Sequence, residues 1–433
     1  MLKIMPRFIL SDAWLFGSLT LLLVSVASYA DEDPSLVRPD KGQFEPQESS
    51  VPPQKYAVPD APPYWKEKLS IKNDAFTMQL SLISVLDYTA FSQDDTNLRQ
   101  VGRMDDEFDV RAMRLIARGS IGQDRKLKYF AATEFEGFDP AHTNVFSLVD
   151  AYLSYPFFGP QAQISVGKMK ETFAYEMVGD SANLAQQERI LNPFFVSRNV
   201  GVKLSGVGPD ERMTAAIGAF NDSWVTGGLD GSATDYTGRV TGILGDPRSA
   251  DYLHLGAAVR RVGAGDDALR LRGRPETNVG ANFVDTGTFN ANHAWNYGLE
   301  ALWNKGPFSL LFEQVWSVVD AGGSGDPVFA GNYLTASWFL TGDYRPYDPT
   351  VGYARRVQPQ HQWGALELVA RISQLDLEDG DIHGGEMKRV FVGMNWWATQ
   401  RWRVGVGWGH TWLDRDGKSG ESDSILTRLQ WVF

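Results

Sequence analysis

The sequence predicts an all-β protein, a transmembrane antiparallel β-barrel of 16 strands with a third loop folded into its lumen. Three observations support this fold class. Stretches of roughly ten to fifteen residues alternate between apolar and polar side chains, so each predicts a strand with one face of each kind. The linkers between these stretches alternate in length. The last stretch ends at Phe433, with Trp431 and Leu429 on the same apolar face. Such strands are longer than the average of about five to six residues and are typical of a tilted wall that crosses a bilayer.

The candidate strands number 17, one more than the predicted wall. The first begins at Phe76, where Met78 and Leu80 share its apolar face. The others lie at 107–121, 126–138, 145–157, 161–172, 199–208, 212–221, 236–244, 252–262, 268–276, 295–304, 307–319, 330–342, 361–377, 386–398, 401–413 and 421–433. Because single-chain bacterial barrels have even strand numbers, one candidate is wrong, and we expect it to be a short one near 236–276.

The linkers predict which strand ends meet on each side of the membrane. Short ones with turn residues lie at 122–124, 208–210, 305–307 and 399–400, and long polar ones lie at 321–329, 343–360, 378–385 and 414–420. Short turns on one side and long loops on the other are typical of an outer-membrane barrel.

The segment from Gln161 to Ser205 departs from this pattern. Its two ends alternate as strands, but about thirty residues lie between them, far more than a turn needs. This connection carries Phe173, Tyr175 and Phe194, which are too apolar for a free surface loop. We therefore expect it to fold into the lumen and narrow it.

The N-terminal residues differ from the rest in composition. Residues 1–30 resemble a signal peptide, with Lys3 and Arg7 before an apolar core and a small-x-small cleavage site at 28–30. An uncleaved membrane anchor is the alternative. Residues 31–70 contain eight prolines between Pro34 and Pro63 and predict an extended periplasmic linker, so the barrel should occupy 71–433.

Composition excludes several classes of function. The net charge of −12 argues against a nucleic-acid partner, and the absence of cysteine excludes disulfides and cysteine metal sites. The six histidines have no metal-site spacing, so we expect neither a metal nor a cofactor. A Ser–His pair from Ser424 and His410 is the best hydrolase candidate and a calcium loop at 376–381 is another alternative. Neither stands out from ordinary wall and loop residues, and we expect no enzymatic activity.

Several stretches resemble the phosphate-selective porin O and P family. They are FDVRAMRL (108–115), LVDAYLSY (148–155), VGKMKETFAYE (166–176), QERILNPFFVSRNVGV (187–202), LRLRGRPE (269–276), NYLTASWFLTGDYRPYD (332–348) and ALELVARISQLDL (365–377). The resemblance runs from about residue 73 to the C-terminus. It implies a 16-stranded, homotrimeric porin with an inward third loop and an anion path lined by arginines and lysines.

The resemblance also implies candidate pore-lining residues. Arg270, Arg272 and Arg274 fall where the family places arginines that pass anions down the wall, Arg189 at a constriction position and Asp150 at a pore-lining acid. We add three further cations of these stretches, Lys168, Arg198 and Lys203, as candidates. Met177 stands where phosphate-specific members tend to carry a lysine, which leaves the choice among phosphate, polyphosphate and other oxyanions open.

The alternation supports part of this assignment. The three arginines of 270–274 share one face of an extended strand, and facing lipid would cost about 2–4 kcal/mol for each. The lumen or an extracellular rim remains, and we favour the lumen. The polar faces of the predicted strands carry charges of both signs. They predict a transverse electric field across a water-filled lumen, formed by Glu300, Glu313, Glu367 and Arg371. Arg111 and Arg114 fall on opposite faces unless a β-bulge lies nearby.

The sequence thus predicts an outer-membrane porin of a Gram-negative bacterium, a water-filled channel for small, preferably anionic solutes. Its other expected partners are outer-membrane lipid, lipopolysaccharide and two further copies of the chain. The alternative is a structural or adhesive barrel whose lumen is closed by the inward loop.

Overall fold

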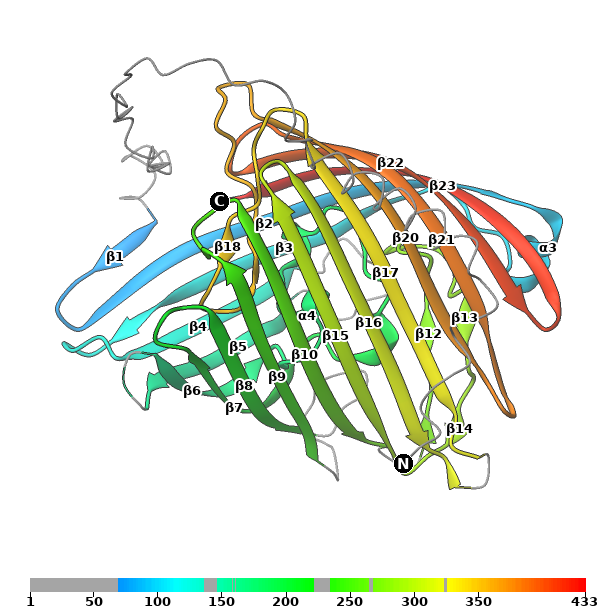
Figure 1. Ribbon diagram of the computed structural model, residues 1–433, viewed down its shortest axis with the longest axis horizontal. Helices are drawn as coiled ribbons and strands as arrows, with labels where there is room; N and C mark the ends of the chain where they lie inside the picture. Colours follow the sequence, from blue (N-terminus) through cyan, green and yellow to red (C-terminus); the bar gives the residue numbers. More distant parts are fainter. Residues whose placement is uncertain are drawn as a thin grey trace, which may run out of the picture. The chain divides into compact units, whose positions relative to one another are not determined.

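The computed structural model describes residues 69–135, 146–157, 159, 161–221, 234–264, 268–322 and 325–433. The chain divides into two units, 1–57 and 58–433, of which the first lies wholly outside the described residues. The predicted signal peptide and nearly all of the predicted linker therefore lie outside them too. The second unit is a β-barrel, shown in Figure 1.

Sixteen antiparallel strands form the closed wall, as the sequence predicts. They are β2 (Phe76–Gln93), β3 (Glu107–Ile121), β4 (Leu127–Phe135), β5 (Phe146–Pro156), β6 (Ala162–Met169), β7 (Asn199–Val207), β8 (Met213–Asn221), β9 (Thr234–Gly245), β10 (Asp251–Gly263), β15 (His293–Lys305), β16 (Phe308–Asp320), β17 (Val328–Phe339), β20 (Ala365–Asp379), β21 (Ile382–Trp397), β22 (Trp402–Arg415) and β23 (Lys418–Val432). The wall closes because β2 pairs with both β3 and β23. A short strand, β1 (Ser70–Lys72), pairs with β2 beyond the end of β23. None of the helices among the described residues is long and apolar enough to cross a membrane.

The two faces of the wall follow the period of two in the sequence. In β15, Trp295, Tyr297 and Leu299 are exposed on the outside, while Asn296 and Glu300 are buried inside. Lipid contact favours the apolar face outside, because the bilayer core offers no partner for a polar group.

A β-bulge in β3 places Arg111 and Arg114 on the same, inner face of the wall, as their spacing in the sequence required. Val85 of β2 faces Ala112 and Asp87 faces Asp109, so two residues of β3 lie opposite Leu86. The extra residue shifts the alternation by one position. Arg111 and Arg114 therefore both bind partners inside the barrel.

The connections differ from the predicted alternation at three places. The linkers at 378–385 and 414–420 are two-residue turns, 380–381 and 416–417, because the flanking strands extend through most of each linker. The segment 340–364, which contains 343–360, joins β17 to β20 and so lies at the end of the barrel that carries the short turns. We call this end the turn end, the opposite end the loop end, and residues 340–364 the turn-end segment. The segment includes two short strands, β18 (Tyr347–Asp348) and β19 (Tyr353–Ala354).

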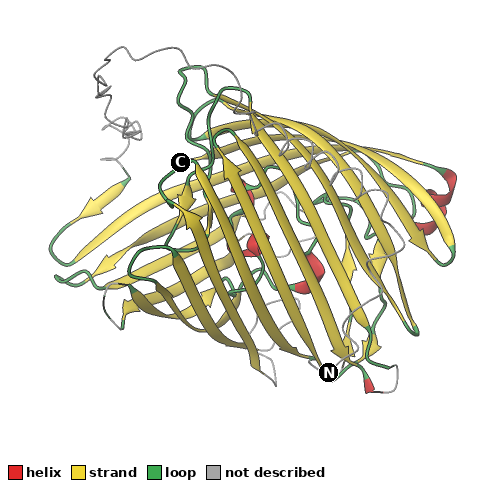
Figure 2. Cartoon of the chain, viewed as in Figure 1, coloured by secondary structure: helices red, strands yellow, loops and turns green. Residues whose placement is uncertain are grey.

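Residues 170–198, which we call the inward loop, fold into the lumen as predicted. The loop contains α4 (Tyr175–Val178) and two 3-10 turns, η1 (Ser181–Asn183) and η2 (Asn192–Phe194). Figure 2 shows these helical turns in red inside the ring of strands, whereas the helix α3 (Asp95–Val101) lies at the end of β2. Phe173, Met177 and Leu191 of the loop are completely buried.

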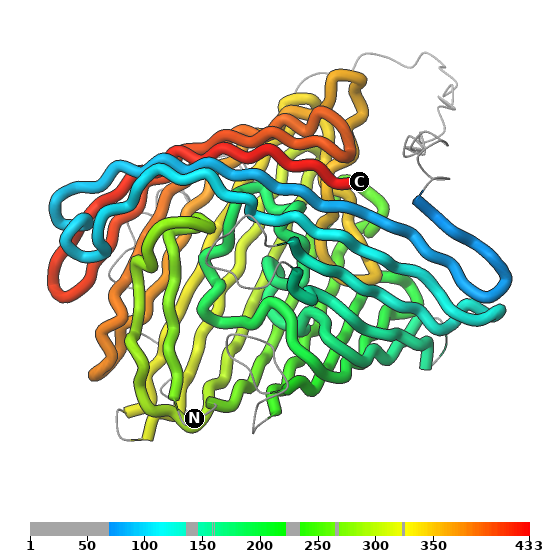
Figure 3. Tube along the Cα trace, turned by 180° about the vertical axis from the view of Figure 1, so that it is seen from behind, coloured from blue at the N-terminus to red at the C-terminus, as the bar shows by residue number. Residues whose placement is uncertain are grey.

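The seventeenth candidate strand, 268–276, is not part of the wall. It belongs to residues 268–290 between β10 and β15, which we call the inner hairpin. There β11 (Ala268–Leu269) pairs with β14 (Phe289–Asn290), and β12 (Arg272–Gly273) with β13 (Val284–Asp285). The inner hairpin packs against β20 and β21 and is seen from behind in Figure 3. The candidate strand that does not belong to the wall therefore lies in the region near 236–276, as the even number of strands predicted.

The inward loop and the inner hairpin share an apolar core with part of the wall. Its members include Phe173, Ile190 and Phe194 of the loop, Leu271, Phe283 and Val284 of the hairpin, and Val315, Phe329, Leu375 and Met387 of the wall. On this side Arg260 and Arg371 of the wall have no exposed side-chain surface, whereas Arg111 and Arg198 on the other side are 22% and 15% exposed. The arginines beside β3 to β7 are therefore more accessible to solvent than those of this filled half of the lumen.

Candidate functional site

The inward loop is held by polar side chains of the wall. The N–H groups of Tyr175 and Glu176 donate to the Glu313 carboxylate at 2.6 and 3.3 Å, and Arg403 donates to the carbonyls of Leu184 and Ala185 at 2.7 and 2.9 Å. An irregular backbone that is buried needs such partners, because it has no strand to pair with. These bonds hold the loop at defined points of the wall.

The predicted transverse field is therefore wrong for the charged wall residues on which it was based. Glu313 binds the inward loop, and Arg371 pairs with Glu176 of the loop at 3.1 Å and with Glu276 at 2.6 Å. Glu300 and Glu367 pair with Arg239 and Arg345, whose guanidinium groups also bind backbone carbonyls of inward segments. All four predicted residues are nearly or fully buried, so they stabilise the filled half of the lumen instead of lining a water path.

The arginines of the inner hairpin share one face, as their alternation predicts. Leu269, Leu271 and Gly273 face the apolar core, and Arg270, Arg272 and Arg274 are exposed on the other side. A Cβ atom on Gly273 would lie 2.5 Å from Leu375 Cδ2 and 3.2 Å from Met387 Cε. The absence of a side chain at Gly273 therefore lets the hairpin approach the wall.

The three arginines have different partners. Arg270 makes a bidentate ion pair with Asp285, at 2.8 and 2.6 Å, which neutralises its charge. Arg274 donates to the carbonyls of Gly280 and Asn278, both at 2.9 Å, and keeps its charge. The side chain of Arg272 makes no hydrogen bond or ion pair within the described part of the chain.

Arg272 and Arg274 line a cavity of about 260 Å³ between the inner hairpin and the inward loop. Arg189 and Glu188 of the loop and Arg111 of β3 line it as well. The remaining lining residues are Asn192, Phe195, Ser197, Gly273, Thr277, Asn278 and Asn282. The lining thus holds four guanidinium groups and one carboxylate, so its local charge is positive although the chain is acidic.

Glu188 neutralises only one of the four arginines. It binds Arg111 directly and lies 3.8 Å from Arg428, which itself pairs with Asp87. Burial disfavours the charge of Glu188, but Arg111, together with Arg428 and Arg189, outweighs this effect and holds the pKa of the carboxyl group below its ordinary value. Arg189 donates to the carbonyls of Glu176 and Gly179, at 2.6 and 3.4 Å, and forms no ion pair with an acid among the described residues. Burial lowers the pKa of Arg189, yet a guanidinium group remains charged at any physiological pH.

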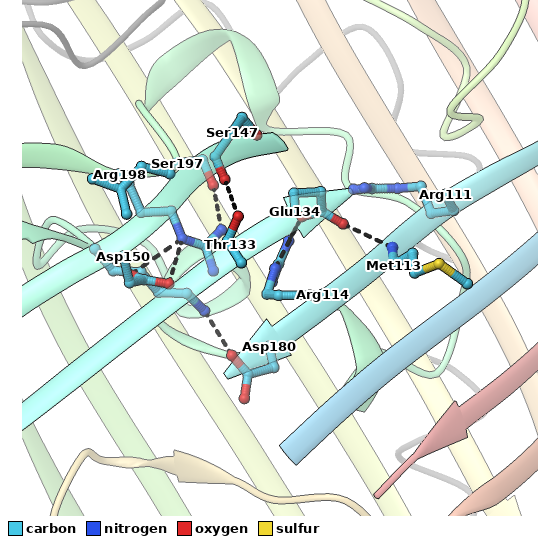
Figure 4. A network of polar contacts seen from close by, with 12 residues as sticks. Arg111, Met113, Arg114, Thr133, Glu134, Ser147, Asp150, Asp180, Ser197 and Arg198 are labelled. Carbon is cyan, nitrogen blue, oxygen red and sulfur yellow. Dashed lines mark hydrogen bonds and ion pairs between the residues drawn. The ribbon is translucent and has the colours of Figure 1, made fainter. Parts of the chain in front are cut away.

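A second polar group lies on the inner face of β3 to β7, shown in Figure 4. Arg198 pairs with Asp150 at 3.2 Å, Arg114 with Glu134, and Lys170 with Asp180 at 2.9 Å. The Lys203 ammonium group donates to the Lys170 carbonyl at 3.3 Å. Burial lowers the pKa of Lys170 to about 8, against the opposing effect of Asp180. This group holds four cations and three acids, so it carries a smaller excess of positive charge than the cavity.

Lys168 does not face the lumen, in contrast to its predicted role. It pairs in register with Ala151 and Val200, and Val166, on the same face of β6, is 52% exposed on the outer surface. Its ammonium group reaches the Leu148 carbonyl at 2.9 Å. The alternation of β6 already indicated this face, since Lys168 lies two residues after Val166.

Sequence reasoning missed or misjudged several other residues. The sequence gives no signal for Glu188, Asn192 and Asn282 as site residues. Their place in the cavity depends on how the inward loop and the inner hairpin meet. The Ser–His alternative is excluded by register: His410 faces Asp423, whereas Ser424 is buried and binds Arg389 at 2.7 Å on the opposite face.

The closed barrel with inward segments defines the chain as an outer-membrane porin. The family model of the phosphate-selective porins O and P matches residues 85–433, so the chain belongs to this family. A solved structure of OmpT, an outer membrane protein of Vibrio cholerae, superposes with a TM-score of 0.53 at 11% identity, over 84% of this chain and 99% of that one. An anion-selective porin from Comamonas acidovorans gives 0.52 at 14% identity, over 83% and 100%.

At these identities the solved structures show likeness of fold alone. An uncharacterised protein of Caulobacter vibrioides is 28% identical over 193 residues, which cover 42% of this chain and 36% of that relative. The match thus spans about a third of the relative's length. The fold and the family place this chain in the outer membrane of a Gram-negative bacterium.

Proposed function

We propose that this porin is a water-filled channel that prefers small anions. The observation that carries the proposal is the cavity between the inner hairpin and the inward loop, with four arginines and one carboxylate. Arg189, Arg272 and Arg274 form no ion pair with an acid in the described ranges of the chain, so their charge is available to a solute. Guanidinium groups offer forked donors to oxyanions, and several sites of moderate strength let an ion enter and leave.

The negative charge of the whole chain does not oppose this preference. Asp87, Glu300 and Glu367 inside the barrel each have a buried arginine partner, so their fields are largely cancelled. Selectivity depends on charges along the solvent path, since exposed charges elsewhere are screened within about 10 Å. Along that path the cavity is positive, and the group around Asp150 holds four cations and three acids.

A path for anions follows from these positions. Solutes from the loop end meet the exposed arginines of the inner hairpin, pass the cavity and continue along β3 to β7, where Arg198 and Lys203 lie beside Asp150. We do not include Lys168 in this path. Phosphate and polyphosphate are the solutes that the family name suggests, and other oxyanions fit the same donors.

The remaining expectations concern the processing of the chain, its lack of enzymatic activity and its assembly in the membrane. We propose that the chain loses residues 1–30 as a signal peptide, that 31–70 form a periplasmic linker, and that it acts without enzymatic activity. We further propose a homotrimer in contact with lipopolysaccharide. A trimer form of the Vibrio cholerae OmpT, with a TM-score of 0.50 and 12% identity, supports the trimer by analogy of fold.

The reversal potential of the purified protein in a planar bilayer tests the anion preference. In a potassium chloride gradient we expect a potential of the sign set by chloride. A potential near zero, or one set by potassium, would contradict the proposal.

The apolar core in half of the lumen favours a second candidate, a structural or adhesive barrel that conducts nothing. Single-channel recording separates the two. Discrete current steps support the channel, and their absence in a folded, inserted protein supports the closed barrel.

A further inference from the structure

We propose that the cavity between the inner hairpin and the inward loop selects polyhydroxylated organic oxyanions, such as sugar phosphates and sugar acids, over inorganic phosphate. This inference rests on the proposed anion channel and names its substrate class. It follows from three features of the lining: the size of the cavity, the arrangement of its charged donors, and the neutral polar groups between them.

The cavity is larger than a simple oxyanion requires. Its volume of about 260 Å³ approaches the lower limit of roughly 300 Å³ for small-molecule sites. It corresponds to the liquid volume of about eight or nine water molecules. A single phosphate ion would leave most of this space to water, whereas a phosphorylated hexose would occupy much of it.

Two of the three charged donors, Arg189 and Arg274, are fixed before a solute arrives. Nε and Nη2 of Arg189 are bound to carbonyls of the inward loop, and Nε and Nη1 of Arg274 to carbonyls of the inner hairpin. Among the described residues, each of these two guanidinium groups therefore keeps one terminal nitrogen without a partner, Nη1 of Arg189 and Nη2 of Arg274, and Arg272 keeps all of its donors. Fixed donors lose little entropy on binding, which suits recognition of one oxyanion group.

Neutral polar groups fill the rest of the lining. The side-chain amides of Asn192 and Asn282 make no hydrogen bond within the described part of the chain, although both line the cavity. The Thr277 hydroxyl donates to the Val279 carbonyl at 2.7 Å and can still accept. The Glu188 carboxylate is a further acceptor.

Amides and hydroxyls both donate and accept, so they match sugar hydroxyls. A site for phosphate alone would use only the N–H donors of the two amides, leave their carbonyl oxygens without a role, and be weakened by the carboxylate of Glu188. We assign the oxyanion of the solute to Arg189, Arg272 and Arg274, and its hydroxyls to Asn192, Asn282 and Glu188.

Block of the chloride current through the full-length protein in planar bilayers tests the inference. The probes are glucose 6-phosphate, gluconate, inorganic phosphate and glucose. We expect glucose 6-phosphate to half-block at a concentration about tenfold lower than phosphate, a ratio that one or two added hydrogen bonds supply. Gluconate should also block more strongly than phosphate, and uncharged glucose should not block. Block by only one of the two sugar derivatives would narrow the class to that oxyanion.

Asparagine variants test whether the stronger block by glucose 6-phosphate arises in the cavity. The double variant Asn192→Ala/Asn282→Ala should raise the half-blocking concentration of glucose 6-phosphate to that of phosphate and leave phosphate block unchanged. Asn290→Ala is the matched control, because Asn290 is an exposed asparagine of the same hairpin outside the cavity.

The outcomes distinguish this inference from the proposed function. A chloride-selective channel that phosphate and glucose 6-phosphate block equally would overturn the inference and leave the anion channel intact. Undiminished block by glucose 6-phosphate in the double asparagine variant would also overturn it. A channel without anion preference would overturn the proposed function itself. The comparison on the unmodified protein is decisive even if the variant fails to fold.

Discussion

Replacing Arg272 and Arg274 by glutamine should shift the selectivity of the channel towards cations. The two side chains are exposed and form no ion pair with an acid in the part of the chain that the structure describes. The substitutions therefore remove two uncompensated charges and keep neutral donors. A unit charge about 4 Å from an ion contributes about 1 kcal/mol in bulk water and about 4 kcal/mol at an effective dielectric constant of 20. We take the lower value because both groups are exposed and screened.

The two charges together contribute about 2 kcal/mol to the energy of an ion beside them. Every 1.4 kcal/mol corresponds to a factor of ten in the occupancy of the site by that ion. The ratio of chloride to potassium permeability should therefore fall by at least about tenfold. The reversal potential in a potassium chloride gradient measures this ratio directly.

The inner hairpin offers a charge-neutral control. Arg270 and Asp285 form a bidentate pair, so the double variant Arg270→Gln/Asp285→Asn removes a pair without changing the net charge. We expect its reversal potential to equal that of the unmodified protein. An unchanged potential in a folded Arg272→Gln/Arg274→Gln variant would refute the reasoning, because these arginines would then lie off the conduction path.

Three further predictions concern the packing of the lumen. Gly273→Ala should destabilise the barrel by about 1–3 kcal/mol, because the new Cβ overlaps Leu375 Cδ2 in a packed core, and thermal unfolding in detergent measures this; a Leu375→Ala background should reduce the cost. Deleting about 180–190 should raise single-channel conductance and lower thermal stability, because the buried Arg403 loses its carbonyl partners; unchanged conductance in a folded variant would place the loop off the path. Burial raises the pKa of Glu176 from 4.5 to about 7. The folded state therefore binds this proton more tightly than the unfolded state, so stability should fall as pH rises from about 4.5 through 7. Glu176→Gln should remove this part of the pH dependence, and an identical pH profile would contradict it.

The wall could be predicted from the sequence because its two environments impose a strict alternation. Lipid outside requires apolar side chains and the interior accepts polar ones, so the period of two gives both the strands and their faces. The bounds of β3 agree with the predicted 107–121, and an anomaly in the alternation correctly indicated the bulge beside Arg111. The inward loop was recognisable because its length and aromatic content fit neither a turn nor a free loop.

The site could be predicted only in part, because alternation shows that a strand has two faces without showing what each face contacts. LRLRGR at 269–274 alternates like a wall strand, but its apolar face meets a protein core instead of lipid. The sequence could place Arg272 and Arg274 on one face, yet it could not show that Asp285 neutralises Arg270. Lys168 shows the opposite error, since it shares the face of Val166 and the alternation alone places it on the outer surface.

The inward segments from the two ends of the barrel meet inside it and stabilise each other. The Ala354 N–H of the turn-end segment donates to the Tyr175 hydroxyl at 2.9 Å, and Arg345 donates to the Asn183 carbonyl at 2.7 Å. Tyr175 also contacts Tyr353 edge to face, within a small aromatic core of both segments. Because Arg345 also pairs with Glu367 of the wall, the inward loop is bound both to the strands and to a segment from the turn end. Its position therefore depends on the whole barrel, and the cavity arginines that it carries or faces are fixed by contacts with both ends of the lumen. A loop held in this way positions ion-binding groups, whereas a mobile lid would need far fewer buried partners.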